Sequence, residues 1–359
     1  MPGVFTISLD LELRWGTRDK LSLDQYQANI LGTHRAVPAL LRLFERYEIA
    51  ATWAAVGFLY CRNKTELLER VPPLRPGYAD PRLSPYADLD QLGNDERDDP
   101  LHFGASLVDR IADSPRQELA THTLSHYYCL EPGQSGLEFA VDLQAALQLA
   151  RDHYRRDLKT IVFPRNQVNA EYLEICQALG LRAYRGNEEA WWYRARSEAA
   201  VTPLVRMARF GDTFFSFSGS HAHRLSLNKG LVNVPSSRFL RPYNPRLRWL
   251  DPLRLRRIRR SMEEAAREDL VYHLWWHPEN FGLHLEENLA FLEQVLEVYQ
   301  DLSQRLGMQN LSMLEAAQTA SPTLPLPAAK DTRTRPNLTT LSLVLAEVAL
   351  NNPLYERLL

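Results

Sequence analysis

Two histidines four residues apart, His122 and His126, are the side chains of this sequence best suited to bind a metal ion. At this spacing they fall on one face of a helical turn, where neutral imidazoles can reach the same Zn²⁺-type ion. The apolar–polar run that begins at Gln117 predicts that the pair lies where a strand gives way to a loop or a short helix. The sequence therefore indicates half of a metal site.

Oxygen ligands for the other half are available near the N-terminus. In the run FTISLDLEL, residues 5–13, polar and apolar side chains alternate, which predicts a strand. Side chains two apart on a strand share a face, so Asp10 and Glu12 point the same way. In hydrolytic metal sites one carboxylate can bind the ion while another works as a base. We therefore expect a divalent metal here, with Zn²⁺ as the first candidate.

A second pair with the same spacing, His273 and His277, lies in the run LVYHLWWH, residues 270–277. His273 stands inside the apolar part of this run, and a buried, hydrogen-bonded histidine is a common component of a protein core. His277 stands at its end, where a strand would deliver it to a site. The sequence predicts a core role for His273 and a functional role for His277.

Four ordered blocks of the sequence carry a resemblance to a known family. They are SLDLE at 8–12, HTLSH at 122–126, FPRN at 163–166 and LWWH at 274–277, and the run ATWAAVG at 51–57 is consistent with them. With these blocks the chain resembles the polysaccharide deacetylase superfamily, the hydrolases with a NodB-homology domain that include carbohydrate esterase family 4. The resemblance spans about residues 4 to 318.

For the metal, the resemblance implies that Glu12, His122 and His126 hold the ion, which polarises an amide carbonyl and binds the attacking water. Two histidines and one carboxylate leave open the coordination position that hydrolysis needs. Cys129, three residues after His126, is therefore not expected to be a ligand.

For the catalytic residues, the chemistry of an amide requires a base and an acid. We expect Asp10 to take the proton from the water, and Arg165 to hold Asp10 ionised and oriented. His277 is expected to protonate the departing amine as the general acid, because an amine is a poor leaving group until it is protonated.

The sequence also departs from the common family pattern at two places. Leu11 separates the two carboxylates, where the common pattern has adjacent aspartates, and Arg165 follows Pro164, where the family arginine usually precedes its proline. The first departure leaves open whether Asp10 or Glu12 is the acidic metal ligand. The second leaves open the tethering role of Arg165.

Strand-like and helix-like segments alternate along most of the chain. The strand-like runs are residues 4–9, 51–56, 118–121, 160–163, 182–184, 231–234, 270–276 and 310–313. Helical spacing occurs at residues 23–47, 136–154, 170–179, 252–268 and 285–306. This order predicts an α/β fold, a (β/α)7–8 barrel. The resemblance to a NodB-homology domain implies that the barrel can be distorted or incomplete. Catalytic groups of such a barrel belong at the carboxyl ends of strands, where Asp10, His122, Arg165 and His277 are expected.

The chain divides by composition into a large domain and a tail. Residues 1–320 are predicted to form the barrel domain, in which residues 71–104, rich in Pro, Asp and Gly, are a long insertion near the site. Residues 321–337 are rich in Pro and Thr and have the composition of a linker. Residues 338–359 are predicted to form a C-terminal helix and tail. Docking of this helix on its own domain is favoured over another subunit or a membrane surface.

Charge and hydropathy exclude some classes of function. A formal charge of −2 with 24% charged residues argues against a nucleic-acid binder that works by bulk electrostatics. Residues 254–260, which hold five arginines, are instead predicted to form an amphipathic helix with a solvated cationic face. Nowhere do 18 apolar residues run together, so no membrane span is expected. Peripheral membrane contact and the oligomeric state stay open.

The expected location is the cytoplasm. Three widely separated cysteines, an odd number, suit reduced thiols, and the N-terminus runs into a strand without the basic region of a signal peptide. The substrate is therefore expected to be a cytosolic intermediate and not a finished cell wall.

The function predicted from the sequence is that of a metal-dependent amide hydrolase that removes an N-acyl group, acetyl first among candidates, from a sugar or glycan precursor. Two alternatives are hydrolysis of a non-sugar C–N bond and a catalytically silent carbohydrate-binding protein. Which sugar and which acyl group are not determined. Candidates for contact with the substrate are Trp191, Trp192, Trp275, Trp276, His221 and His223.

Overall fold

The computed structural model describes residues 2–197, 200–214 and 218–320. The described residues up to Ala320 form one compact unit. The predicted linker and C-terminal helix, residues 321–337 and 338–359, lie outside the described residues. Within the described residues, no helix combines the length and the apolar composition needed to cross a bilayer.

Four parallel strands form the centre of the sheet. β1 (Val4–Leu11) lies between β2 (Ala51–Ala55) and β9 (Val271–Trp276), and β3 (Gln117–Thr121) pairs with the other side of β2. All eight residues of β1 are buried, polar ones included. Strands covered on both faces are typical of parallel sheets with helices outside.

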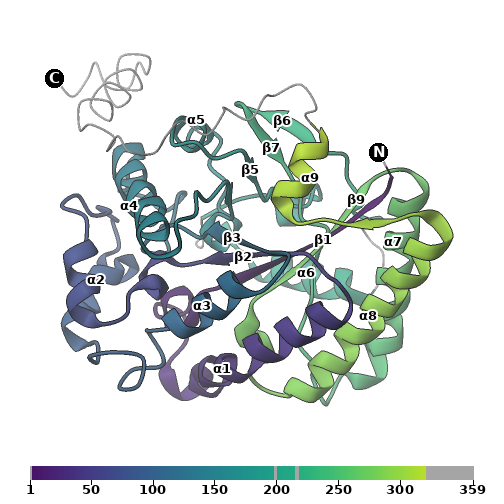
Figure 1. The fold of residues 1–359 in the computed structure, drawn as a ribbon, viewed down its shortest axis with the longest axis horizontal. Coiled ribbons are helices and arrows are strands. Elements are labelled where there is room, and N and C mark those ends of the chain that lie inside the picture. Colours follow the sequence, from purple (N-terminus) through teal and green to yellow (C-terminus); the bar gives the residue numbers. More distant parts are fainter. Residues whose placement is uncertain (1, 198–199, 215–217, 321–359) are drawn as a thin grey trace. The chain divides into compact units, whose positions relative to one another are not determined.

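Shorter strands extend this centre on both sides. The order across the sheet is β6-β7-β5-β4-β3-β2-β1-β9-β8, with β10 paired to β1. Among the described residues, β6 and β8 are the two ends of that order, so the sheet curls into a barrel that stays open, as the sequence predicted (Figure 1). The bounds of the shorter strands are β4 (Thr160–Ile161), β5 (Ala183–Tyr184), β6 (Ser226–Asn228), β7 (Leu231–Asn233), β8 (Arg238–Phe239) and β10 (Gln309–Asn310).

The helices lie around the sheet, with α2 and α4 at one side and α7 and α8 at the other (Figure 1). The described helices are α1 (Leu23–Arg46), α2 (Lys64–Arg70), α3 (Ala105–Asp113), α4 (Gly136–Tyr154), α5 (Leu173–Ala178), α6 (Pro203–Phe214), α7 (Asp251–Arg267), α8 (Leu285–Leu306) and α9 (Met313–Ala320). The longest of them follow the predicted spans within a few residues. Their strong 3.6-residue apolar pattern explains this agreement, since burial of an apolar face stabilises a helix more than propensity does.

The interior of the barrel is filled by small side chains. Ala54, Ala120 and Ala183, from β2, β3 and β5, form a buried cluster with Val162, which directly follows β4, and Met313 of α9 packs onto it. Close packing of this kind leaves no room for a channel through the barrel. The functional groups must therefore lie at its end.

The expected strand at residues 310–313 is shorter than predicted, because a helix begins inside it. Ser312 and Glu315 form a reciprocal pair in which each side chain accepts from the other's backbone N–H, at 2.8 and 3.3 Å. This capping pair starts α9 at Met313. The apolar run alone could not distinguish a strand from a capped helix.

The predicted insertion, residues 71–104, consists largely of turns that include two short 3₁₀ segments. None of its residues lines the pocket described below. It contacts the segment after β1 instead, where the indole of Trp15 donates to the His102 carbonyl at 2.8 Å and Arg18 donates to the Arg82 carbonyl at 3.0 Å. The insertion thus supports the chain that follows Glu12.

The cationic face predicted for residues 254–260 is only partly solvated. Arg254 and Arg257 of α7 are buried, and Arg257 donates to the Asp212 carboxylate at 3.0 Å. Arg254 pairs with Asp251 at 2.6 Å. Tertiary ion pairs therefore draw these two arginines inward, which the helical period could not reveal.

Candidate metal centre and pocket

Glu12, His122 and His126 converge at one end of the barrel. Glu12 follows β1 and His122 follows β3 directly, so the parallel strands bring both to the same edge of the sheet. The Nε2 atoms of His122 and His126 lie 2.9 and 3.1 Å from Oε1 of Glu12. All three residues are buried, and their ligand atoms lie within 4.8 Å of one another.

The loop that carries the two histidines is not the helical turn suggested by their spacing. Thr123 and His126 both have left-handed backbone angles, with φ of 64° and 60°. The loop is fixed by side chains: the Thr123 hydroxyl accepts from the Tyr127 N–H at 2.7 Å, and buried Asp142 accepts from the Leu124 N–H at 2.8 Å and from the Ser125 hydroxyl. These bonds offset the strain of the left-handed residues and aim both rings at Glu12.

The protonation of the two rings suits metal binding. Nδ1 of His122 lies 2.8 Å from the Val162 carbonyl and donates to it, which leaves the lone pair on Nε2, facing Glu12. Burial lowers the pKa of His126 to about 4, so its ring is neutral at neutral pH. Burial would raise the pKa of Glu12, but His277 and His126 outweigh it and hold the carboxylate ionised. Two imidazole nitrogens and one carboxylate oxygen are a donor set of catalytic zinc sites.

The backbone and a glycine determine where Glu12 lies. The Glu279 carboxylate accepts from the N–H groups of Glu12 and Leu13, at 3.0 and 2.5 Å. Gly16 lies so close that a Cβ there would stand 1.6 Å from Oε2 of Glu12. Neither residue was identified from the sequence, although Glu279 follows the predicted strand end at His277.

Asp10 lies beside this cluster in a buried ion pair with Arg185. The two carboxylate oxygens accept from the two terminal nitrogens of the guanidinium, each at 2.6 Å. Arg185 also donates to Ser8 at 2.9 Å and to Asn166 at 2.8 Å. Its guanidinium carbon lies 4.3 Å from the centre of the Trp275 ring. Burial would raise the pKa of Asp10, but the charge of Arg185 lowers it, so Asp10 is ionised.

The arginine predicted to tether Asp10 was Arg165, and the structure gives this position to Arg185. Arg165 donates to Asp19 at 2.6 and 2.5 Å and stacks 3.9 Å over the Tyr128 ring. A signal for Arg185 was present in the sequence, since it directly follows a predicted strand. The resemblance pointed to the arginine next to Pro164 instead. The left-handed backbone of Arg165 turns the side chain of that arginine away from Asp10.

His277 faces both carboxylates at the end of β9. Its Nε2 lies 3.4 Å from Glu12 and 3.9 Å from Asp10, and its side chain is 27% exposed. Burial alone would lower the pKa of His277, but the negative charges of Glu12 and Asp10 raise it to about 9. The ring is therefore a cation at neutral pH, which can donate a proton into the pocket.

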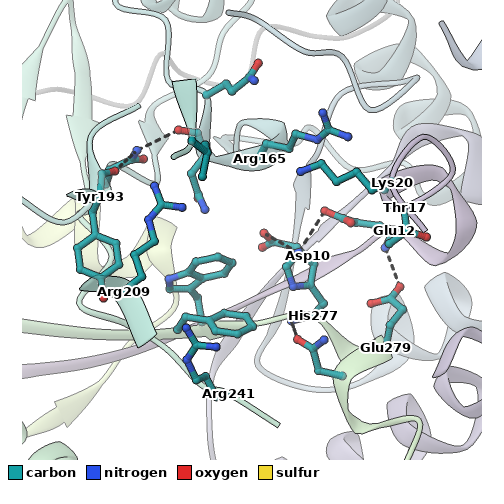
Figure 2. A pocket seen from close by; sticks show the side chains of 18 of the residues that line it. Asp10, Glu12, Thr17, Lys20, Arg165, Tyr193, Arg209, Arg241, His277 and Glu279 are labelled. Atoms are coloured by element: carbon teal, nitrogen blue, oxygen red, sulfur yellow. Dashed lines mark hydrogen bonds and ion pairs between the residues drawn. The ribbon is translucent and has the colours of Figure 1, made fainter. Parts of the chain in front are cut away.

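These residues open into a pocket of about 590 Å³. Figure 2 shows Asp10, Glu12 and His277 gathered at one side of it, with Arg209 and Arg241 at the other. Such a volume suits a ligand of the size of a sugar with a substituent.

The other predicted contact residues are divided between pocket and core. Trp275 lines the pocket, whereas Trp276 is buried and stacks on Phe281 with ring centres 5.6 Å apart. Within the described residues, the pocket lining does not include Trp191, Trp192, His221 or His223. Cys129 is buried, with a pKa that burial raises well above its usual value.

His273 has the core role that the sequence predicted. Its Nε2 lies 2.8 Å from the Ser8 hydroxyl and its Nδ1 lies 3.3 Å from the Val234 carbonyl. The side chain is fully buried in β9.

Part of the chain matches a known protein family. Residues 24–184 match the profile of the family described as polysaccharide deacetylase. None of the curated proteins matches the sequence significantly. The blocks at residues 8–12 and 274–277, which also carried the resemblance, lie outside the matched range.

Solved structures share the fold at low sequence identity. A putative polysaccharide deacetylase from Mycobacterium smegmatis is 14% identical with a TM-score of 0.55, and the alignment covers 93% of this chain and 94% of that one. A probable polysaccharide deacetylase from Pseudomonas aeruginosa is 10% identical with a TM-score of 0.52, covering 90% and 92%. Puue allantoinase is 9% identical with a TM-score of 0.55, covering 90% and 91%. The family match over residues 24–184 supports a hydrolase of the deacetylase type, and the solved structures show that the fold is shared.

Proposed function

We propose that this protein is a metal-dependent amide hydrolase that removes an N-acetyl group from a sugar or glycan precursor. The observation that carries the proposal is the convergence of Glu12, His122 and His126 beside an ionised Asp10 and a cationic His277. A metal-ligand set, a base and an acid then meet at the end of one pocket.

Glu12, His122 and His126 would hold a divalent ion, Zn²⁺ by the chemistry of the donors. When bound, such an ion polarises the amide carbonyl and lowers the pKa of a water molecule. The second group of close ligand atoms, Asp10, Glu12 and His277, fits this role less well. Asp10 is committed to Arg185, and His277 is cationic and so has no lone pair to offer at its protonated nitrogens.

The protein's own residues move two protons in the proposed reaction. A carboxylate oxygen of Asp10 accepts a proton from the attacking water, whose oxygen forms a bond to the acyl carbon. Arg185 keeps Asp10 ionised before this step and fixes its orientation. His277 gives a ring proton to the nitrogen as the C–N bond breaks, and the products are a carboxylic acid and an amine.

The experiment that tests the proposal joins metal analysis to product release. Purified protein should contain about one Zn²⁺ per chain and should release acetate from at least one compound in a panel of N-acetylated sugars, nucleotide sugars and lipid-linked sugars. Glu12→Gln should lose both metal and activity, and the exposed Glu45→Gln on α1 should lose neither.

Other outcomes of the same panel would contradict the proposal. Release from linear or cyclic non-sugar amides alone would identify hydrolysis of another C–N bond. Sugar binding without any turnover would identify a carbohydrate-binding protein. The cytoplasmic location stays a prediction from the sequence, and cell fractionation tests it.

A further inference from the structure

One arm of the pocket is lined by arginines. It is formed by residues 193–197 and 200–213, which include most of α6, and by residues 238–241, which include β8. Its described lining residues include six arginines and no Asp or Glu: Arg194, Arg196, Arg206, Arg209, Arg238 and Arg241. We call it the arginine arm. The acidic residues of the lining, Asp10, Glu12, Glu188 and Glu279, come from other segments.

Arg238 is a nearly buried cation in the wall of this arm. Its side chain is 6% exposed, and one terminal nitrogen donates to the Asp212 backbone carbonyl at 3.1 Å. Its Nε and other terminal nitrogen are buried and have no hydrogen-bond partner. The nearby Asp212 carboxylate is already engaged by Arg257, at 3.0 Å, and by Ser218, at 2.6 Å. Both nitrogens are closed off from solvent and the Tyr272 hydroxyl lies beside the guanidinium, so Arg238 contributes a fixed positive charge to the arm.

The backbone of Arg241 follows β8, which pairs with β9. Phe239 of β8 pairs with Trp275 of β9, and the Leu240 N–H donates to the Trp275 carbonyl at 2.8 Å. Because Phe239 is paired with Trp275, the same parallel register places the backbone of Arg241 opposite that of His277. Arg241 donates through Nε to the Thr213 hydroxyl at 2.7 Å, which leaves its two terminal nitrogens for a ligand.

We propose that the arginine arm binds a phosphate or diphosphate group attached to the sugar whose amide is hydrolysed. Guanidinium groups bind phosphate oxygens in a bidentate manner. The arginines of the arm would therefore select a phosphorylated sugar over a neutral one. This inference rests on the proposed function, because it assigns the substrate class of the same site. The phosphate carrier is a nucleoside or a lipid, and both present the same group to the arm.

The test compares substrates that differ only in the anionic group. We expect kcat/KM for a sugar 1-phosphate, a nucleoside-diphosphate sugar or a sugar diphosphate on a short isoprenoid in detergent to exceed that for the neutral methyl glycoside by about ten- to hundredfold. Arg241→Gln should abolish this preference, and Arg241→Lys should retain part of it. Arg246→Gln, the same change at an exposed arginine outside the pocket lining, should leave it intact. Whichever phosphorylated substrate is best identifies the carrier.

Pyrophosphate binding, measured by calorimetry, provides a readout that does not depend on turnover. Arg241→Gln should weaken it by about tenfold or more, and Arg246→Gln should not. Deacetylation of neutral and phosphorylated sugars at equal rates would overturn the inference and leave the proposed function standing. Arg241-dependent pyrophosphate binding without hydrolysis of any sugar amide would support the anion site and overturn the proposed function. A preference for a sugar carboxylate over a phosphate would also overturn the inference.

Discussion

At the scale of single residues, the site separates two carboxylates that are neighbours on one face of a strand. Asp10 is bound by a guanidinium, and Glu12 faces two imidazoles. Both are ionised, but only Glu12 has oxygens directed at neutral nitrogen ligands. Their environments therefore assign the metal to Glu12 and the base to Asp10 in the proposed mechanism.

Substitution of the two carboxylates should have different effects. Glu12→Gln should release the metal, because an amide oxygen is a weaker ligand than a carboxylate. Asp10→Asn should keep the metal and lower kcat by about 10²–10⁴, the contribution typical of a positioned base. Metal content by atomic emission, measured beside kcat, checks both. Loss of metal in Asp10→Asn with retention in Glu12→Gln would reverse the assignment.

His277→Ala should leave the metal content unchanged and lower turnover of the amide by about 10²–10⁴, since a general acid acts on the leaving group. An activated aryl ester, whose phenolate departs without protonation, should be hydrolysed almost as fast as by the wild type. The ratio of the two rates is the measurement. An equal loss on both substrates would mean that His277 orients the substrate or supports the fold.

At the scale of elements, short segments after the strands position the site. The 3₁₀ turn Leu13–Gly16 follows β1 and sets the side chain of Glu12 against Gly16. The turn is held from outside by the insertion through Trp15 and from inside by Glu279. A segment fixed from both sides cannot shift to make room for a larger residue.

Gly16→Ala should therefore displace Glu12, because the new Cβ would stand 1.6 Å from Oε2. We expect loss of bound zinc and a decrease of about 1–3 kcal/mol in the free energy of unfolding, the range typical of overpacking. Gly136→Ala at the start of α4 is the control, since its Cβ would lie 3.3 Å from the nearest atoms. Metal titration and urea denaturation measure the two effects. Full zinc affinity in Gly16→Ala would show that Glu12 is not the ligand.

At the scale of the whole molecule, the polar core of the barrel makes stability depend on pH. Burial lowers the pKa of His273 to about 3, from an ordinary value of 6.5, so the folded protein keeps this ring neutral. Below pH 6.5 the unfolded chain binds a proton at this residue that the folded chain does not. The contribution of His273 to stability is therefore present above that pH and is lost as the pH falls toward 3.

His273→Gln should remove this dependence. The difference in unfolding free energy between the wild type and this variant should change in favour of the variant by about 1.4 kcal/mol for each pH unit below about 6.5. Above pH 7.5 the difference should be constant, which serves as the internal control. Denaturant unfolding from pH 4 to 8 measures it, and a difference that stays flat below pH 6.5 would contradict the buried neutral state of His273.

What the sequence by itself determined is the alternation of strands and helices, the barrel and the residues at strand ends. These follow from local periodicity and from the rule that parallel strands deliver their carboxyl ends to one edge. The apolar run around His273 also predicted its core role. Local periodicity did not predict α9 or the short strands β6 and β8. A capping pair starts α9, and β6 and β8 are strands of two or three residues at the sheet edges, too short to show a pattern.

Only the tertiary structure decided which partners the strand-end residues have. Arg165 and Arg185 both follow short strands, and nothing in their local sequence tells which one reaches Asp10. The backbone of Arg165 turns left-handed and directs it to Asp19, while Arg185 continues from β5 into the barrel. Glu279 likewise accepts from the backbone of Glu12 although 267 residues separate them. Gly16 meets the side chain of Glu12 only because the chain turns sharply after β1. The identity of a residue sets what chemistry it can perform, and packing sets the group on which it performs it.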